Sequence, residues 1–330
     1  MLKSLFYCFP IIFTFFTAKE PKQFKISGLA QGTDYAIMYY ANDKIVTKDD
    51  IDSLLHEIDK SMSLYQEGSL INQFNAASQE IKVDDLLQNV LKKSFDINKD
   101  TKGIFDVTVA PLVQAWGFGP KNNRIEPTSD EIKLMLKCTG MNNIQLQNGR
   151  LLKTKKCIQI DLNGIAQGYS VDLIANYLST KGIRSFVAEL GGEIRVSGPK
   201  PDGTPMKIGI EGPDVDGTPL IRHIAEFNSG AITTSGNYRK FYQSGNKRIS
   251  HLIDAKSGYP VDNEMISVTV YAKDAITADG YDNALMAMHL PQALKFVEKR
   301  KDLEAYFVYH KKDGAIADTL STGFRKLISN

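Results

Sequence analysis

Three oxygen-bearing side chains stand close together in the segment AITADGYDNALMAM, residues 275–288. Asp279, Asp282 and Asn283 are spaced i, i+3 and i+4, which places them on one face of a helix. Two carboxylates so close repel each other unless a cation lies between them. Oxygen ligands of this kind suit Mg²⁺, usually shared with phosphate oxygens. The alternative is a helix start decorated with acids, which the helix dipole tolerates, and these residues alone favour neither interpretation.

A second candidate is the histidine of SHLIDAKSGYP, residues 250–260. His251 is one of only 5 histidines in the chain, and it stands three residues before Asp254 and ahead of a Ser-Gly-Tyr-Pro turn. Ser235, in the segment ITTSGNYRKFY, would complete a Ser-His-Asp set with these two residues. That hydrolase interpretation is weak, because no Gly-x-Ser-x-Gly elbow surrounds the serine.

Two further segments combine acids with turns. In GIFDVTVAPLVQAWGFGP, residues 103–120, Asp106 interrupts an apolar, β-rich run. A buried acid must be paired, hydrogen-bonded or functional; the alternative is a core strand plugged by Trp116. In QIDLNGIAQGYSVDLIANYL, residues 159–178, a strand ends at Asp161 and a tight turn at Asn163-Gly164 leads into a helix. Such a turn can present backbone groups to a ligand, but a plain strand-turn-helix fits equally well.

These residues need regular elements to position them. Apolar periodicity predicts helices over 49–65, 84–97, 128–137, 169–178, 277–288 and 291–299. Strands are predicted over 158–162, 185–189, 193–196, 266–271 and 305–309, with a strand pair or one bent strand within 24–41. The two kinds of element interleave without a regular βαβ rhythm, which predicts a mixed, layered α+β domain. The Gly-, Pro- and Asp-rich stretch 198–217 predicts a surface loop.

Composition and charge exclude little but do argue against one class of partner. The hydrophobic content of 42% and charged content of 24% are those of an ordinary soluble globular protein. The net charge is +2, and Lys and Arg are scattered along the chain. We therefore expect no nucleic-acid partner.

The N-terminus predicts export. Lys3 is followed by an apolar run over 5–16 and small residues near Ala18, so we expect residues 1–18 to be a cleaved signal peptide and 19–330 to be the mature domain. The run is shorter than the roughly 20 residues that span a bilayer; an uncleaved anchor and a buried helix are the alternatives. In an oxidising compartment Cys138 and Cys157 could pair, although two separately buried thiols fit the sequence as well.

Seven segments together resemble the ApbE-type FAD:protein FMN transferases. Each motif alone is modest, but their order and spacing from about Gly32 to Met288 are specific. The segments are MSLYQEGSLINQFN at 62–75, GIFDVTVAPLVQAWGFGP at 103–120, DLNGIAQGYSVD at 161–172, LGG at 190–192, TSGNYR at 234–239, SHLIDAKSGYPV at 250–261 and ADGYDNALMAM at 278–288.

The resemblance implies an activity and a set of site residues. These enzymes bind FAD with a divalent metal, transfer the FMN half to a Thr (sometimes Ser) hydroxyl of a target protein, and release AMP. It implies Mg²⁺ ligands at the Gly164 carbonyl and the side chains of Asp279, Asp282 and Asn283. It implies FAD contacts at Gln31, Tyr65, Ile104, Phe105, Asp106, Asp161, Gln167 and Ile253.

By the same resemblance, His251 matches the family's functional histidine, and its usual pKa of about 6.5 suits a base for the incoming hydroxyl. The alternative is a histidine that only hydrogen-bonds the flavin or its loop. Some positions depart from the family pattern: Gln31 replaces a common Met, Gln167 a frequent Lys and Asn283 a frequent Thr, and Ala-Lys-Ser at 255–257 replaces Pro-Arg-Thr. These changes could shift the balance between transfer and hydrolysis.

We therefore expect an exported, periplasmic Mg²⁺-dependent FMN transferase, either free or held at the inner membrane. Its expected partner is a redox protein carrying an Asp-x-x-Ser/Thr-Gly-Ala-Thr-like motif, such as a subunit of a Na⁺-translocating NADH:quinone reductase or an Rnf-type complex. The alternatives are a metal-dependent FAD pyrophosphatase giving FMN and AMP, and a non-catalytic periplasmic flavin-binding protein.

Overall fold

The computed structural model describes residues 20–121, 126–215, 218–237, 241–244 and 247–329. The predicted signal at 1–18 lies outside this part of the chain. Within the described residues, no helix combines the length and the apolar character that crossing a bilayer requires.

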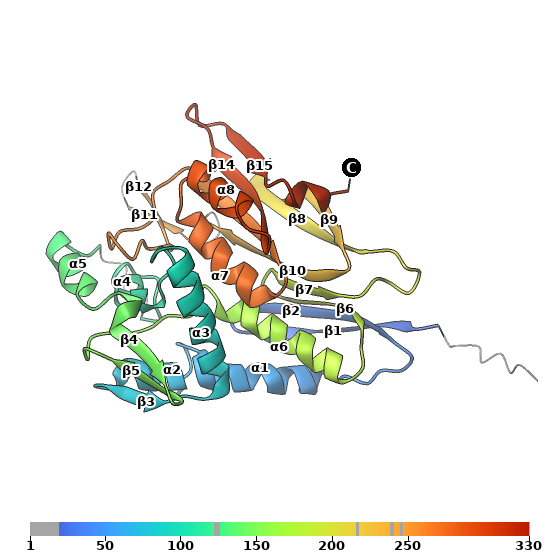
Figure 1. Cartoon of the computed structure of the whole chain (residues 1–330), viewed down its shortest axis with the longest axis horizontal. Coiled ribbons are helices and arrows are strands. Elements are labelled where there is room, and N and C mark those ends of the chain that lie inside the picture. Colours follow the sequence, from blue (N-terminus) through green and yellow to red (C-terminus); the bar gives the residue numbers. More distant parts are fainter. Residues whose placement is uncertain (1–19, 122–125, 216–217, 238–240, 245–246, 330) are drawn as a thin grey trace, which may run out of the picture.

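An antiparallel sheet of eight strands runs through the middle of the molecule (Figure 1). Its edge hairpin is turned by Gln31 and Gly32, whose φ values of 53° and 76° fit a two-residue hairpin turn, so the predicted strand pair is confirmed. In spatial order the strands are β1 (Lys22–Ala30), β2 (Thr33–Ala41), β6 (Ser185–Leu190), β7 (Glu193–Ser197), β10 (Ser229–Gly236), β13 (Met265–Ala272), β14 (Leu303–His310) and β15 (Ile316–Leu320).

Helices cover one face of this sheet and build the main core with it. Helix α7 (Ala275–Met286) packs on β10 and β13, and α6 (Ala166–Thr180) packs on β6, β7 and α7. Helices α1 (Lys48–Met62), α3 (Asp85–Asp100) and α8 (Leu290–Glu298) complete this layer (Figure 1). Both α6 and α7 are buried along most of their length, so polar side chains on them must find partners within the protein.

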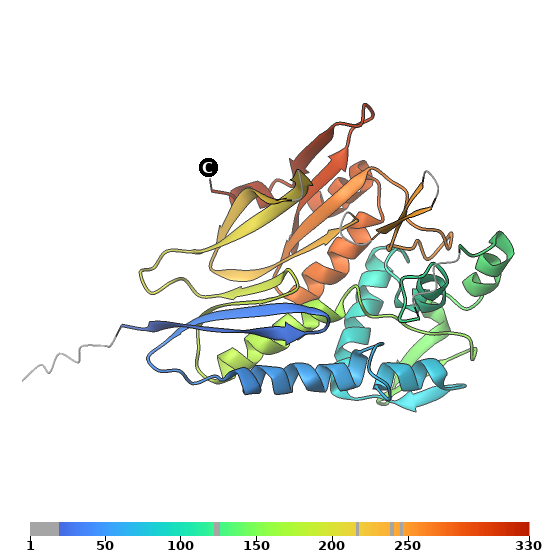
Figure 2. The same ribbon diagram turned by 180° about the vertical axis from the view of Figure 1, so that it is seen from behind.

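The opposite face of the sheet is covered by a hairpin of β8 (Met206–Val215) and β9 (Thr218–Phe227), which Figure 2 shows from behind. A second apolar cluster fills the space between, together with the C-terminal 3₁₀ turn η3 (Phe324–Lys326); it includes Met206, Phe227, Tyr306 and Phe324. The prediction of a surface loop over 198–217 is therefore wrong in its second half, because alternate residues of β8 are buried against this cluster.

A smaller lobe lies beside the helical layer. Its helices are α2 (Leu70–Ala76), α4 (Ala110–Ala115) and α5 (Ser129–Leu136), with the 3₁₀ turns η1 (Val107–Val109) and η2 (Met141–Asn143). Its strands are β3 (Glu80–Lys82), β5 (Arg150–Lys153) and β4 (Ile144–Gln147) in one sheet, and β11 (Phe241–Ser244) and β12 (Lys247–Ser250) in another. Cys138 and Cys157 form a disulfide across this lobe, with Cα atoms 5.6 Å apart, which settles the choice left open by the sequence.

One predicted strand, and a second that the sequence left open as an alternative, are absent from the described residues. Residues 158–162 run outside any sheet, because the Asn75 side chain takes both backbone groups of Ile160 and the Val107 carbonyl accepts the N–H of Asp161. The β-rich run after Ile104 forms η1 and α4 instead of a core strand. Pro111 in the first turn of α4 favours that outcome.

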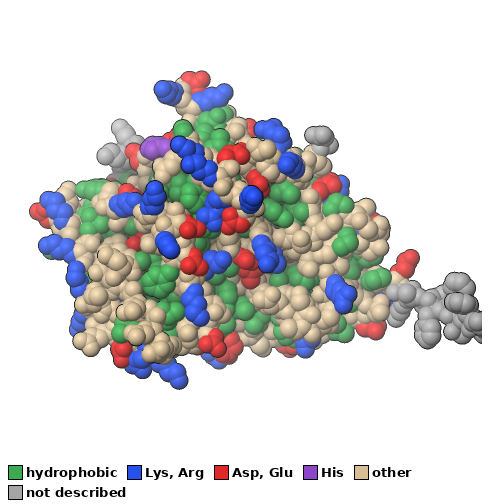
Figure 3. Space-filling model, viewed as in Figure 1, with side chains coloured by type: hydrophobic (Ala, Val, Ile, Leu, Met, Phe, Trp, Pro, Cys, Tyr) green, Lys and Arg blue, Asp and Glu red, His purple; other side chains and the backbone are tan. Residues whose placement is uncertain are grey.

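Acidic and basic side chains are interspersed on the face seen in Figure 3. No single sign of charge dominates that face, in keeping with the net charge of +2.

Candidate functional site

The floor of the site is formed by two acids of helix α7. Asp279 and Asp282 expose only 3% and 1% of their surface. Asp279 Oδ2 accepts the backbone N–H of Gly168 at the start of α6, at 2.9 Å. Asp282 Oδ2 accepts the hydroxyl of Thr233 on β10, at 2.6 Å. Each acid therefore has one oxygen tied to a neighbouring element and one oxygen left for the site.

Those remaining oxygens converge on Asn283. Its Nδ2 lies 3.3 Å from Asp279 Oδ1, 3.0 Å from Asp282 Oδ1 and 3.3 Å from the carbonyl oxygen of Gly164. The backbone carbonyl of Asp279 lies 3.1 Å from the same nitrogen. The sequence-predicted metal set is thus brought to one point. Rotation of the amide about its last bond would exchange Nδ2 for Oδ1 and complete an all-oxygen ligand set of the kind that Mg²⁺ prefers.

Burial strongly affects the charge of this pair. Desolvation raises the pKa of Asp279 to about 7, opposed by the N–H of Gly168. Burial, and after it the neighbouring Asp279 charge, holds the pKa of Asp282 well above its usual value. Such a pair remains partly protonated at neutral pH unless a cation compensates the two charges. The described residues hold no cluster of three or more His, Cys, Asp or Glu suited to a metal, so an ion here would depend on the carbonyl and the amide as well.

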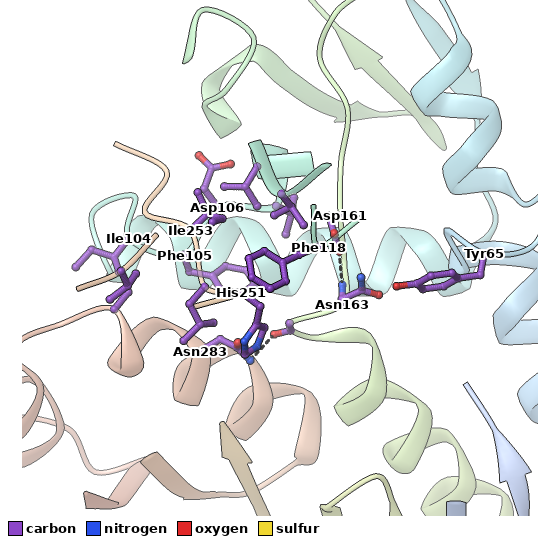
Figure 4. A pocket seen from close by; sticks show the side chains of 17 residues that line it. Tyr65, Ile104, Phe105, Asp106, Phe118, Asp161, Asn163, His251, Ile253 and Asn283 are labelled. Carbon is purple, nitrogen blue, oxygen red and sulfur yellow. Dashed lines mark hydrogen bonds between the residues drawn. The ribbon is translucent and has the colours of Figure 1, made fainter. Parts of the chain in front are cut away.

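Above the floor lies a cavity of about 210 Å³, which we call the histidine pocket (Figure 4). Ten of its lining residues mark its extent: Tyr65, Ile104, Phe105, Asp106, Phe118, Asp161, Asn163, His251, Ile253 and Asn283. His251 stands with its ring 6.2 Å from that of Phe118, edge-on. The loop behind it is closed by Asp254, whose backbone and carboxylate bond to Gly258, Tyr259 and Lys256. Ser235 donates a hydrogen bond to Asn283 Oδ1 at 3.4 Å and so contacts the floor of the site.

The two other acids of this pocket are held in turns. Asp106 accepts from the backbone N–H and hydroxyl of Thr108 at 2.8 and 2.5 Å and from the Met141 N–H at 3.1 Å. The acid that the sequence places in an apolar run is therefore buried and hydrogen-bonded. Burial raises the pKa of Asp106, and these hydrogen bonds oppose that shift. Asp161 accepts the N–H of Asn163 at 2.8 Å, which shapes the turn that leads to Gly164.

A second cavity, of about 550 Å³, adjoins the first; we call it the glutamine pocket. Its lining residues include Gln31, Asp59, Gln66, Ala166 and Gln167, and it shares Tyr65 and Asn163 with the histidine pocket. The Gln31 amide bonds to Ser170 Oγ on α6 at 2.9 Å. Figure 4 shows Tyr65 and Asn163 pointing toward each other at this junction.

The structure thus brings all the sequence-predicted site residues into two adjoining pockets and their floor. Sequence reasoning missed Phe118, Asn163, Leu252 and Asp59. Phe118 and Asn163 lie inside segments that the motifs had marked, so the motifs contained a signal for them. Asp59 is one polar residue on an amphipathic helix, and nothing in its local sequence distinguishes it. The end of the motif at 234–239 lies outside the described residues.

Comparison with known proteins gives consistent results. Residues 31–307 match the ApbE family. A Vibrio cholerae protein named FAD:protein FMN transferase is 35% identical over 318 residues, 94% of each chain; its Haemophilus influenzae namesake is 32% identical over 322 residues, 94% of this chain and 92% of the other. Among solved structures, the flavin transferase ApbE from Vibrio cholerae has a TM-score of 0.84 at 35% identity, covering 93% of this chain and 99% of that one. The apo form of Pseudomonas stutzeri flavinyl transferase ApbE has a TM-score of 0.85 at 30% identity, covering 94% and 98%.

Proposed function

Since this chain belongs to the ApbE family, we propose that it is a Mg²⁺-dependent FAD:protein FMN transferase that moves FMN from FAD to a Thr or Ser hydroxyl of a redox protein and releases AMP. The convergence of four oxygen atoms on Asn283, beneath two adjoining pockets, is the observation that carries this proposal.

The charges around the pockets support a bound cation. Among the described lining residues of both pockets there is no Lys or Arg, whereas Asp59, Asp106 and Asp161 are present. A pyrophosphate would add further negative charge to this acidic surface. The start of α6 at Ala166 and Gln167 offers only partial positive charge. The floor residues Asp279, Asp282 and Asn283, together with the backbone carbonyl of Gly164, would hold Mg²⁺, which would neutralise charge on the phosphate oxygens.

His251 is the base in this proposal. The acceptor hydroxyl attacks the FMN phosphorus, a new phosphorus–oxygen bond forms, and the bond to AMP breaks. His251 takes the hydroxyl proton, and AMP leaves with the bridging oxygen. In reactions of this kind catalysis comes mostly from positioning and charge stabilisation, which fits a site built from hydrogen-bonded turns. Tyr65, Phe105 and Phe118 offer aromatic faces for a flat ring system.

We further propose that the protein acts in the periplasm, on an acceptor with an Asp-x-x-Ser/Thr-Gly-Ala-Thr-like motif such as a subunit of a Na⁺-translocating NADH:quinone reductase or an Rnf-type complex. The apolar N-terminal segment and the Cys138–Cys157 disulfide support the location, because disulfides persist in oxidising compartments.

The deciding experiment incubates the chain lacking residues 1–18 with FAD and Mg²⁺, with and without an acceptor domain that carries this motif. A matched acceptor has Val in place of the final Thr. Intact mass of the acceptor and released AMP are measured. A Mg²⁺-dependent gain of one FMN on the Thr acceptor only is the expected result. AMP without that gain would indicate a pyrophosphatase, and bound FAD with neither product would indicate a flavin carrier.

A further inference from the structure

Helix α2, which contributes no lining residue to either pocket among those described, is hydrogen-bonded to both sides of their junction. The junction consists of Tyr65 and Asn163, the residues that line both cavities. They come from two irregular segments, 63–69 and 158–165. Neither segment belongs to a helix or a strand up to Ile165, so other groups must fix their backbones.

The first segment is held by Asn72. Its Nδ2 donates toward the carbonyl oxygens of Ser63, Leu64 and Gln66, at 3.4, 3.2 and 2.9 Å. These carbonyls flank Tyr65 on both sides. The Tyr65 side chain itself is 69% exposed, so packing does little to place it and its position follows from its backbone.

The second segment is held by Asn75, one turn further along α2. Asn75 Oδ1 accepts the N–H of Ile160 at 2.8 Å, and its Nδ2 donates to the carbonyl of the same residue at 3.0 Å. The side chain thus replaces a neighbouring strand. Lys153 reinforces this contact, because its ammonium donates to the carbonyls of Phe74 and Ile158, both at 2.8 Å. Lys153 is only 5% exposed and lies over the Phe74 ring, 4.7 Å from its centroid.

These contacts hold segments 63–69 and 158–165 at a fixed distance from each other. Asn72 and Asn75 lie on a helix of seven residues, which at about 1.5 Å per residue is about 10 Å long. Tyr65 and Asn163 line both cavities and point toward each other (Figure 4), so the two segments approach each other at this junction. Loss of the Asn72 or the Asn75 amide would let the segment that it holds move. The other lining residues of the two pockets would stay in place.

We propose that Asn72 and Asn75 are positioning residues that fix the junction between the histidine and glutamine pockets and thereby select a dinucleotide over a mononucleotide. The inference rests on the proposed function, in which the ligand is FAD. A ligand with two linked halves gains affinity only when both halves engage at once, and it loses that gain when the geometry forbids this. FMN or ADP alone would occupy only one of the two pockets, so the affinity of either should depend little on the geometry of the junction.

The test measures dissociation constants of FAD, FMN and ADP in the presence of Mg²⁺, by flavin fluorescence and calorimetry. We expect Asn75→Ala and Asn72→Ala to weaken FAD binding at least about 10-fold while FMN and ADP change less than about 2-fold. The control is Gln88→Ala on α3, whose amide donates to the Val83 carbonyl at 3.2 Å, outside both segments of the junction; it should change none of the three constants.

Further variants separate positioning from folding. Asn72→Asp keeps the size of the side chain but removes its donors, and it should reproduce Asn72→Ala; thermal unfolding midpoints are recorded for each variant. If Asn75→Ala does not fold, the two Asn72 variants decide. Parallel weakening of all three ligands, or unchanged FAD affinity in the folded variants, would overturn the inference. Transfer is not part of this readout, so a wild-type protein that binds FAD without modifying an acceptor would overturn the proposed function alone.

Discussion

Two parts of the site are built in opposite ways. The helical floor consists of Gly168 on α6 and Asp279, Asp282 and Asn283 on α7, all in regular secondary structure. The irregular wall consists of residues 63–69, 103–106, 158–165 and 251–261, in which turns and side-chain contacts fix the backbone. On the floor, helix geometry positions the functional side chains. In the wall, side chains position the backbone.

This difference has consequences for mutation. On the floor, a substitution changes charge or helix separation, and metal-dependent properties should respond first. In the wall, a substitution changes the proposed base His251 or the placement of a turn, and substrate-dependent properties should respond first.

The largest expected effect is on the floor. Asp279→Ala removes one of the two buried carboxylates of the floor. We expect Mg²⁺-dependent AMP release to fall by more than about 100-fold, because losing even an outer partner of a metal typically costs about 10- to 100-fold. Calorimetric titration with Mn²⁺ should show loss of binding in parallel. Unchanged metal-dependent turnover would remove the proposed ligand set.

In the wall, His251→Gly should slow transfer to the acceptor by about 100- to 10,000-fold, the range typical of a general base. FAD affinity should remain close to that of the wild type, because the remaining lining of both pockets is intact. Added imidazole should restore part of the rate. A variant with the wild-type rate would exclude the role of His251 as base.

The disulfide adjoins the wall, since Cys157 directly precedes 158–165. Replacing both cysteines by Ser opens a loop with a sequence separation of 19. The free energy of unfolding should fall by about 3 kcal/mol, measured by denaturant titration. A reducing agent should destabilise the wild type to the same level and leave the double variant unchanged; equal sensitivity of the two proteins would contradict the prediction.

A pH series tests the contact that joins the two floor helices, α6 and α7. Asp172 on α6 accepts the N–H groups of Ala275 and Ile276 at the start of α7, both at 2.9 Å, and burial raises its pKa to about 6 from 3.8. The folded state therefore binds more protons than the unfolded state between these values. The stability of the wild type relative to Asp172→Asn should decrease as pH rises from 4 to 6.5, by up to about 3 kcal/mol.

Unfolding midpoints of the two proteins across this range check that sign. A difference that grows with pH would show that the hydrogen bonds from α7 outweigh the cost of burying the charge.

The smallest effect is expected from the contact between the two floor helices. A Cβ on Gly168 would lie 2.4 Å from the Ala275 carbonyl oxygen and 2.7 Å from Asp279 Cβ. Gly168→Ala should therefore destabilise the protein by about 1–3 kcal/mol and weaken Mn²⁺ binding. The comparison variant is Gly280→Ala on α7, where the new methyl would lie 2.3 Å from Ile97 Cδ1 and 3.1 Å from Ile165 Cδ1, both at the far ends of side chains and not on the backbone. It should cost less and leave metal affinity unchanged. Equal effects on metal affinity would refute the argument.

The sequence predicted the backbone structure of the floor well and that of the wall poorly. The i, i+3, i+4 spacing on α7 is a local property of a helix, so it can be read without a fold. Residues 158–162 have the composition of a strand, yet a strand needs a partner, and here the Asn75 side chain takes that place from more than eighty positions away. Asn72 and Asn75 were present in a marked motif, but their partners could not be inferred from it.

The sequence by itself determined the helix that carries the acids, most of the strands of the sheet, and the set of residues that gather at the site. Periodicity, capping residues and motif order can be read from the sequence without knowledge of distant contacts. Only the tertiary structure decided that Cys138 and Cys157 pair, that four oxygens meet at Asn283, and that α2 holds segments 63–69 and 158–165 together. These features depend on which distant groups meet, and burial then makes each unmatched polar atom costly enough to select one arrangement.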